Sequence, residues 1–247
     1  MAYITDAFEE IAHSLRILME AHVRAMSGLM KIDRDEAVGN IEHALTNALN
    51  AFASLCDAMA KEGLGKTPDW YATPELATVL LLRNARHHNH AKKIRTIYSH
   101  YIQEASEVGK PEEYVLANVP SADAHDGGQM FEVYQSWGDL SSLFSMPRKE
   151  TKIYEETKSL VCEYMQAERF SVCAVEFSVD EKHIFFNVVP FLVNAGVTIA
   201  PYLKDHVTMR TSEGKSFLNM FTTVLGYADT TNPIFSVIPF LMPPQHE

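Results

Sequence analysis

The chain has 247 residues, of which 47% are hydrophobic and 21% charged, and its formal net charge at pH 7 is -11. This length and composition are typical of a soluble globular protein that buries a sizeable core in one large domain or two modest ones. No apolar run reaches the roughly 18 to 20 residues that a membrane-spanning helix needs, and the first ten residues lack the basic and apolar regions of a signal peptide. We therefore expect a cytoplasmic protein without a membrane partner.

The excess of acidic residues and the spacing of the cysteines argue against two further classes of protein: those that coat nucleic acid and those held together by disulfides or C-x-x-C zinc sites. A field of negative sign repels phosphate, so the chain is not expected to coat nucleic acid broadly, although a local basic cleft within a Debye length of about 8 Å remains open to phosphate. Cys56, Cys162 and Cys173 are odd in number and widely spaced. Neither a disulfide framework nor a C-x-x-C zinc pair is therefore expected.

Long amphipathic helices are predicted in the first part of the chain. Apolar residues recur at three- and four-residue spacing over residues 6–29 and again over residues 34–61. Thr73 followed by Pro74 predicts an N-cap and the first position of a third helix. Asn84 offers a second N-cap, which would end that helix and start another that runs to about residue 105.

The middle of the chain has a less regular pattern. Proline and glycine interrupt residues 109–147, which favours a long, partly ordered connection. Residues 148–169 regain helical spacing, and the β-branched and aromatic run over residues 170–177 predicts a strand.

The last part is strongly apolar but poorly periodic. Over residues 183–203 short buried helices and extended pieces are equally compatible with the pattern; residues 216–225 favour a helix, and the end of the chain favours an extended tail against the core. We therefore predict a mainly α fold, an up-and-down helical bundle over residues 1–169, with an α+β or irregular C-terminal segment, residues 170–247, packed on it.

One segment stands out by its charge. Between residues 76 and 103 there are five arginines or lysines and no acidic residue. Histidine moves protons near neutral pH, and arginine holds phosphate and stabilises charge that develops on it, so the combination predicts chemistry on a phosphodiester. We call this segment the basic island; its cations are Arg83, Arg86, Lys92, Lys93 and Arg95, and its histidines are His87, His88 and His90.

Within the island, Arg83-Asn84, three residues and His88 resemble the R-N-x-x-x-H form of the HEPN superfamily motif. The surrounding helices over about residues 6–169 are similar to that family's bundle. Many members are metal-independent ribonucleases that act as homodimers, with two copies of the motif facing one cleft, and others only bind nucleotides or partners. The resemblance implies no metal or cofactor, catalytic roles for Arg83 and His88, and an orienting role for Asn84.

The remaining polar groups of the island would then bind the substrate: Arg86, His87, His90, Lys92, Lys93 and Arg95. Arg83 and His90 also satisfy the general motif, so the catalytic histidine is not fixed by spacing alone. In that chemistry the histidine acts as general acid or base and Arg83 holds the charged phosphate.

Two other readings of the island stay open. It can be a basic helix face through which a non-enzymatic protein binds an acidic partner. Alternatively, His87 and His90 lie one helical turn apart and could share a metal ion with a third ligand. Candidates for that ligand are His13, His22 and His43.

Overall fold

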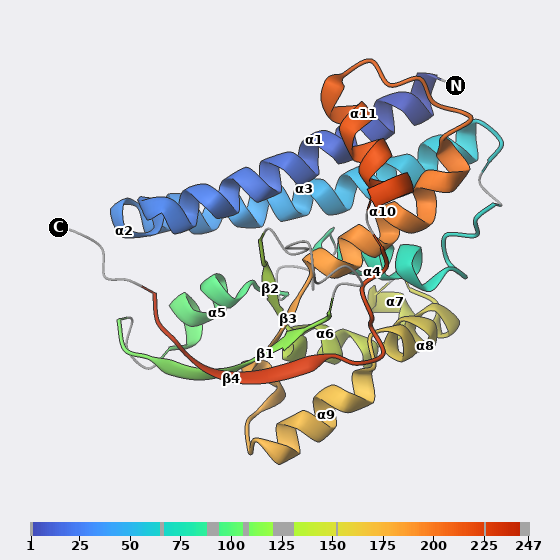
Figure 1. Cartoon of the computed structure of the whole chain (residues 1–247). Coiled ribbons are helices and arrows are strands. Elements are labelled where there is room, and N and C mark those ends of the chain that lie inside the picture. The colour runs from blue at the N-terminus through green and yellow to red at the C-terminus, as the bar shows by residue number, and fades with distance from the viewer. Residues whose placement is uncertain are drawn as a thin grey trace.

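The computed structural model describes residues 2–64, 67–87, 94–105, 109–120, 131–151, 153–224 and 226–242. The fold is mainly helical with a small mixed sheet (Figure 1). Helix α1 (Ala2–Arg24) continues through a π-helical turn (Ala25–Leu29) and the short α2 (Met30–Ile32), and the chain then returns antiparallel as α3 (Arg34–Lys61) (Figure 1). Both long helices predicted from apolar spacing are confirmed. Asp33 caps α3, because its carboxylate accepts a hydrogen bond from the Glu36 N–H at 2.9 Å.

The third helix, α4 (Pro74–His87), begins at the predicted proline. The break predicted at Asn84 is wrong, because the helix continues past it and buries Ala85. The next N-cap is Thr96, whose hydroxyl accepts from the Ser99 N–H at 3.3 Å and starts α5 (Ile97–Glu104). Tertiary packing of α4 therefore outweighs the capping preference of asparagine.

Four strands form one sheet in the order β2-β3-β1-β4. Strand β1 (Glu112–Asn118) pairs parallel with β3 (Ile184–Asn187) and antiparallel with β4 (Ile234–Phe240), while β2 (Tyr134–Ser136) pairs antiparallel with β3. The predicted connection over residues 109–147 is corrected, since β1, β2 and a helix lie within it. Because β1 and β2 precede residue 169 whereas β3 and β4 follow it, the two predicted parts of the chain share one sheet.

Short helices pack around this sheet, and two predictions are corrected here. The single helix predicted over residues 148–169 is divided among α7 (Arg148–Thr151), α8 (Glu155–Tyr164) and the start of α9. The strand predicted over residues 170–177 is helical and belongs to α9 (Ala167–Glu176). Its buried residues, Phe170 and Cys173, are one helical turn apart, and Phe170 stacks on Trp137 of α6 (Trp137–Phe144) with ring centroids 4.0 Å apart.

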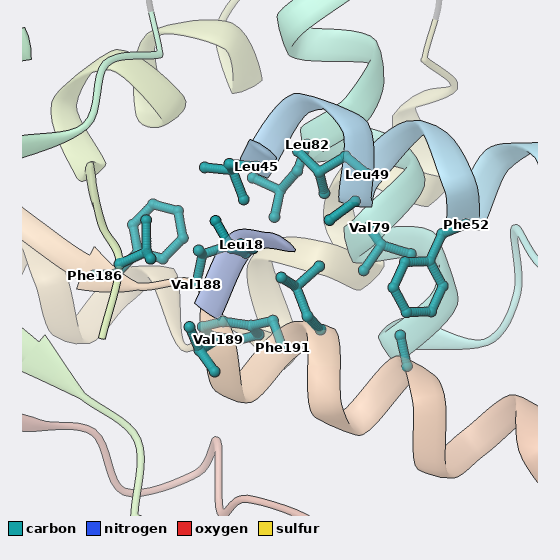
Figure 2. Close-up of a cluster of buried hydrophobic side chains, with 14 of the residues drawn as sticks. Leu18, Leu45, Leu49, Phe52, Val79, Leu82, Phe186, Val188, Val189 and Phe191 are labelled. Atoms are coloured by element: carbon teal, nitrogen blue, oxygen red, sulfur yellow. The ribbon is translucent and has the colours of Figure 1, made fainter. Parts of the chain in front are cut away.

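The apolar C-terminal part supplies the centre of the core. After a 3-10 turn (Glu181–His183) and β3, helix α10 (Val189–Leu203) packs against α4. Helix α11 (Ser212–Asn219) and a π-helical turn (Met220–Val224) follow, and the predicted extended tail forms β4. Figure 2 shows side chains of α1, α3, α4, β3 and α10 meeting in one cluster. Within the described ranges, no helix has both the length and the apolar character needed to cross a bilayer.

Candidate functional site

The basic island lies at the carboxyl end of α4 and extends to the start of α5. The structure describes the side chains of Arg83, Asn84, Arg86 and Arg95. The side chain of His87 and all of His88, His90, Lys92 and Lys93 lie outside the described residues. The roles predicted for those histidines and lysines stay predictions.

Arg86 is held inside the fold by Glu42 of α3. Its Nη2 lies 2.5 Å from a Glu42 carboxylate oxygen, and the Arg86 side chain is 9% exposed. The remaining guanidinium donors bond the Thr46 hydroxyl at 3.1 Å and the Ile94 carbonyl at 3.3 Å. A charge so buried is stabilised only when it is paired and hydrogen-bonded, so Arg86 connects α3 to both flanks of residues 88–93.

Glu42 is the centre of this network. The oxygen that does not face Arg86 accepts from the Thr96 N–H at 3.2 Å and from the hydroxyls of Thr96 and Ser99 at 2.8 and 2.6 Å. Burial alone would raise the pKa of Glu42, but the charge of Arg86 and these donors lower it below its ordinary value. Glu42 therefore fixes the end of α4 relative to the start of α5.

Arg95 is also paired, with Asp139 of α6 and Glu104 of α5. Its Nε and Nη2 bond the two Asp139 carboxylate oxygens at 2.9 Å each, and its Nη1 lies 2.7 Å from Glu104. These hydrogen bonds, above all that to Asp139, raise the pKa of Arg95. Arg86 and Arg95 were predicted to bind substrate, but the structure places both in ion pairs that hold the fold together.

Arg83 differs from these two arginines. Its Nη1 donates to the Asn84 side-chain oxygen at 3.1 Å, whereas its Nε is buried and has no hydrogen-bond partner in the part of the chain that the structure describes. No carboxylate of the described residues forms an ion pair with it. A guanidinium without an acidic partner keeps its charge available for an anion.

Asn84 lines a small pocket beside Arg83. The pocket has a volume of about 60 Å³, and its polar lining groups are Asn84, Tyr71, Tyr154 and Thr157. Its other lining residues, Ala77, Leu80, Leu81 and Ile153, are apolar. Pockets that enclose a whole drug-sized ligand measure about 300 to 1,000 Å³, so this one fits only a compact group. Burial, with smaller effects of Cys56 and Asp57, raises the pKa of Tyr71.

Sequence reasoning missed the residues that complete this region. Tyr71 and Tyr154 reach Asn84 from a loop and from the residue before α8, and Glu42 reaches Arg86 across 44 positions in the chain. None of these belongs to a local motif. Only the absence of acidic residues within the island could have indicated that the partners of its arginines come from elsewhere.

Two of the histidines considered as the third metal ligand, His13 and His22, have other neighbours. His13 Nδ1 lies 3.4 Å from a Glu213 carboxylate oxygen. The His22 ring packs against Phe131 with centroids 5.9 Å apart, and burial lowers the pKa of His22. Among the residues that the structure describes, no three histidine, cysteine or acidic side chains are grouped so that they could hold a metal ion.

Comparisons with protein-family models, with curated proteins and with solved structures found no match to this chain.

Proposed function

We propose that the chain binds RNA or nucleotides at the end of α4 and cleaves RNA without a metal ion, as a HEPN-like helical-bundle protein that acts as a homodimer. The observation that carries the proposal is the state of Arg83. It is the one described arginine of the island that has no carboxylate partner, and its neighbour Asn84 lines a pocket. Arg86 and Arg95, by contrast, serve the fold.

Cleavage of RNA by this route needs few groups of the protein besides Arg83, Asn84 and His88. The 2′-oxygen of RNA forms a bond to the adjacent phosphorus while the bond from phosphorus to the 5′-oxygen breaks, which gives a 2′,3′-cyclic phosphate and a 5′-hydroxyl. One proton leaves the 2′-hydroxyl and one reaches the 5′-oxygen, and His88 is proposed to carry the transfer. Arg83 would hold the phosphate oxygens as their negative charge increases, and Asn84 would orient the guanidinium through the 3.1 Å hydrogen bond.

The test is cleavage of a fluorescent single-stranded RNA in the presence of EDTA. We expect Arg83→Ala and His88→Ala each to reduce the rate by about 100-fold or more. Arg83→Lys keeps the charge but loses the planar fork, so it should recover only part of the activity. Arg24→Ala, which removes an exposed arginine at the end of α1, is the matched control and should cleave like the wild type.

The histidine is identified by the same assay. His87→Ala and His90→Ala, compared with His88→Ala, show which ring carries the proton, and only one of the three is expected to abolish cleavage. RNA cleavage by folded Arg83→Ala at the wild-type rate would overturn the proposal.

A further inference from the structure

Strand β4 lies at the border of the sheet. Of the described strands, only β1 pairs with it, from Glu112 opposite Phe240 to Asn118 opposite Ile234. Figure 1 shows β4 along the lower side of the sheet. It has seven residues, whereas β2 at the other edge has three. The backbone groups on its outer side therefore point away from β1 and form no ladder with another described strand.

This edge carries no charge that would discourage pairing with another chain. Residues 232–242 contain no charged side chain, and Ile234, Val237 and Leu241 are 57%, 45% and 47% exposed. Edge strands of monomeric proteins commonly carry lysine or other charges that prevent pairing with another chain. Pro239, which has no N–H to donate, is the one residue of β4 that discourages pairing, and the rest of this mostly apolar strand has no strand on its outer side among the described residues.

A second copy of the chain fits this edge for two reasons. An antiparallel strand pair has a two-fold axis, and an axis at Val237 places Ile234 opposite Phe240 and Val237 opposite itself, so that apolar side chains meet. Each copy carries a net charge of -11, and copies repel least where the contacting segment is uncharged. The nearest acidic residues along the sheet, Glu112 and Glu113, lie one strand further in, opposite Phe240 and Pro239.

Helix α9 packs beside β4. Its Phe170 contacts Phe235 of β4 with ring centroids 5.2 Å apart, whereas Val172 and Val175, which are 58% and 81% exposed, lie on the side of the helix away from Phe170. We propose that β4 pairs antiparallel with β4 of a second copy, so that one continuous sheet crosses a homodimer and α9 flanks the contact.

The test is the oligomeric state of the full chain by sedimentation velocity at micromolar concentrations. The wild type is expected to sediment as a dimer, and Val237→Lys as a monomer with unchanged circular dichroism. Val23→Lys is the matched control: Val23 is 49% exposed on α1, so this variant should remain a dimer. A monomeric wild type, or a Val237→Lys variant that dimerises like the wild type, would overturn the proposal.

A second readout does not depend on an introduced charge. Opposed residues of antiparallel strands have Cβ atoms about 4.5 to 5.5 Å apart, close enough for a disulfide after a small adjustment. Val237→Cys is therefore expected to form a covalent dimer under mild oxidation, whereas Val23→Cys and the wild type with its three cysteines should not. Equal cross-linking of the two variants would contradict the strand pairing. Neither readout measures RNA cleavage, so a dimer that forms through another surface would refute this interface and leave the ribonuclease proposal standing, whereas a monomeric wild type would also contradict the homodimer of the proposed function.

Discussion

Removal of the Glu42 carboxylate tests the network that positions the basic island. Glu42→Ala leaves the Arg86 guanidinium buried without its counter-charge, and the loss of one partner of a buried ion pair costs about 3 to 5 kcal/mol. Arg86 keeps the Thr46 hydroxyl and the carbonyl of Ile94 as acceptors, so we expect the lower end, about 3 kcal/mol. For a chain of this size that corresponds to a fall in Tm of roughly 6 to 12 °C.

Urea unfolding of four proteins measures the effect: the wild type, Glu42→Ala, Arg86→Ala and the double variant. Once Arg86 is absent, removal of Glu42 no longer leaves a buried unpaired cation. The loss of unfolding free energy in the double variant should therefore be smaller than the sum of the losses in the two single variants by about 0.5 to 3 kcal/mol. Asp6→Ala is the control, because it breaks an ion pair with Arg210 in which both side chains are more than half exposed, and should cost less than about 1 kcal/mol.

The pH dependence gives an independent check of the same network. Since the folded-state pKa of Glu42 lies below its ordinary value of 4.5, the stabilisation is complete above that value and is lost as the pH falls through the lower folded-state pKa. The wild type should therefore lose more stability on acidification below about pH 4.5 than Glu42→Ala loses. A cost below about 1 kcal/mol for Glu42→Ala at pH 7, or strictly additive single variants, would refute the reasoning.

Two further predictions concern the packing and the titration of buried residues. A Cβ atom at Gly138 would lie 2.6 Å from the backbone of Lys182, whereas one at Gly39 meets nothing within 4 Å. Thermal unfolding should therefore show Gly138→Ala destabilised by about 1 to 3 kcal/mol and Gly39→Ala stabilised by about 0.5 to 1 kcal/mol; similar effects of both would contradict the packing. Burial, with a smaller effect of Arg95, lowers the pKa of His100 to about 4. Because the unfolded chain binds this proton below about pH 6.5, the free energy of unfolding should decrease between pH 6.5 and 4. Urea unfolding at pH 7 and pH 5 should show a smaller decrease for His100→Phe than for the wild type. An identical decline in both proteins would count against a neutral, buried His100.

The helices were predictable where the sequence determines them locally. Apolar spacing located α1 and α3, and Thr73 with Pro74 located the start of α4. Of the strands, only the extended C-terminal segment that forms β4 was anticipated. Strand β1 was not, because it is formed by pairing with residues that lie about 70 and 120 positions away, and a short segment carries little information about such partners. In α9 the β-branched and aromatic residues gave the wrong prediction, since Phe170 and Cys173 follow the helical period that buries them.

The candidate site was predictable only in its composition. The motif made Arg83 and Asn84 candidates, which they remain, but the sequence could not show that Glu42 and Asp139 pair with the two neighbouring arginines of the island. Those carboxylates lie 44 residues from Arg86 and Arg95, on α3 and α6. Of the three arginines of the island that the structure describes, only Arg83 therefore has no acidic partner among the described residues.

The most direct test of the central claim is the chemical nature of the ends that the protein produces from RNA in EDTA. If Arg83 holds the phosphate while an island histidine transfers the protons, the wild type yields 2′,3′-cyclic phosphate and 5′-hydroxyl ends, and Arg83→Ala yields them about 100-fold more slowly. No cleavage by the wild type, ends of another kind, or equal rates for the two proteins would contradict the account.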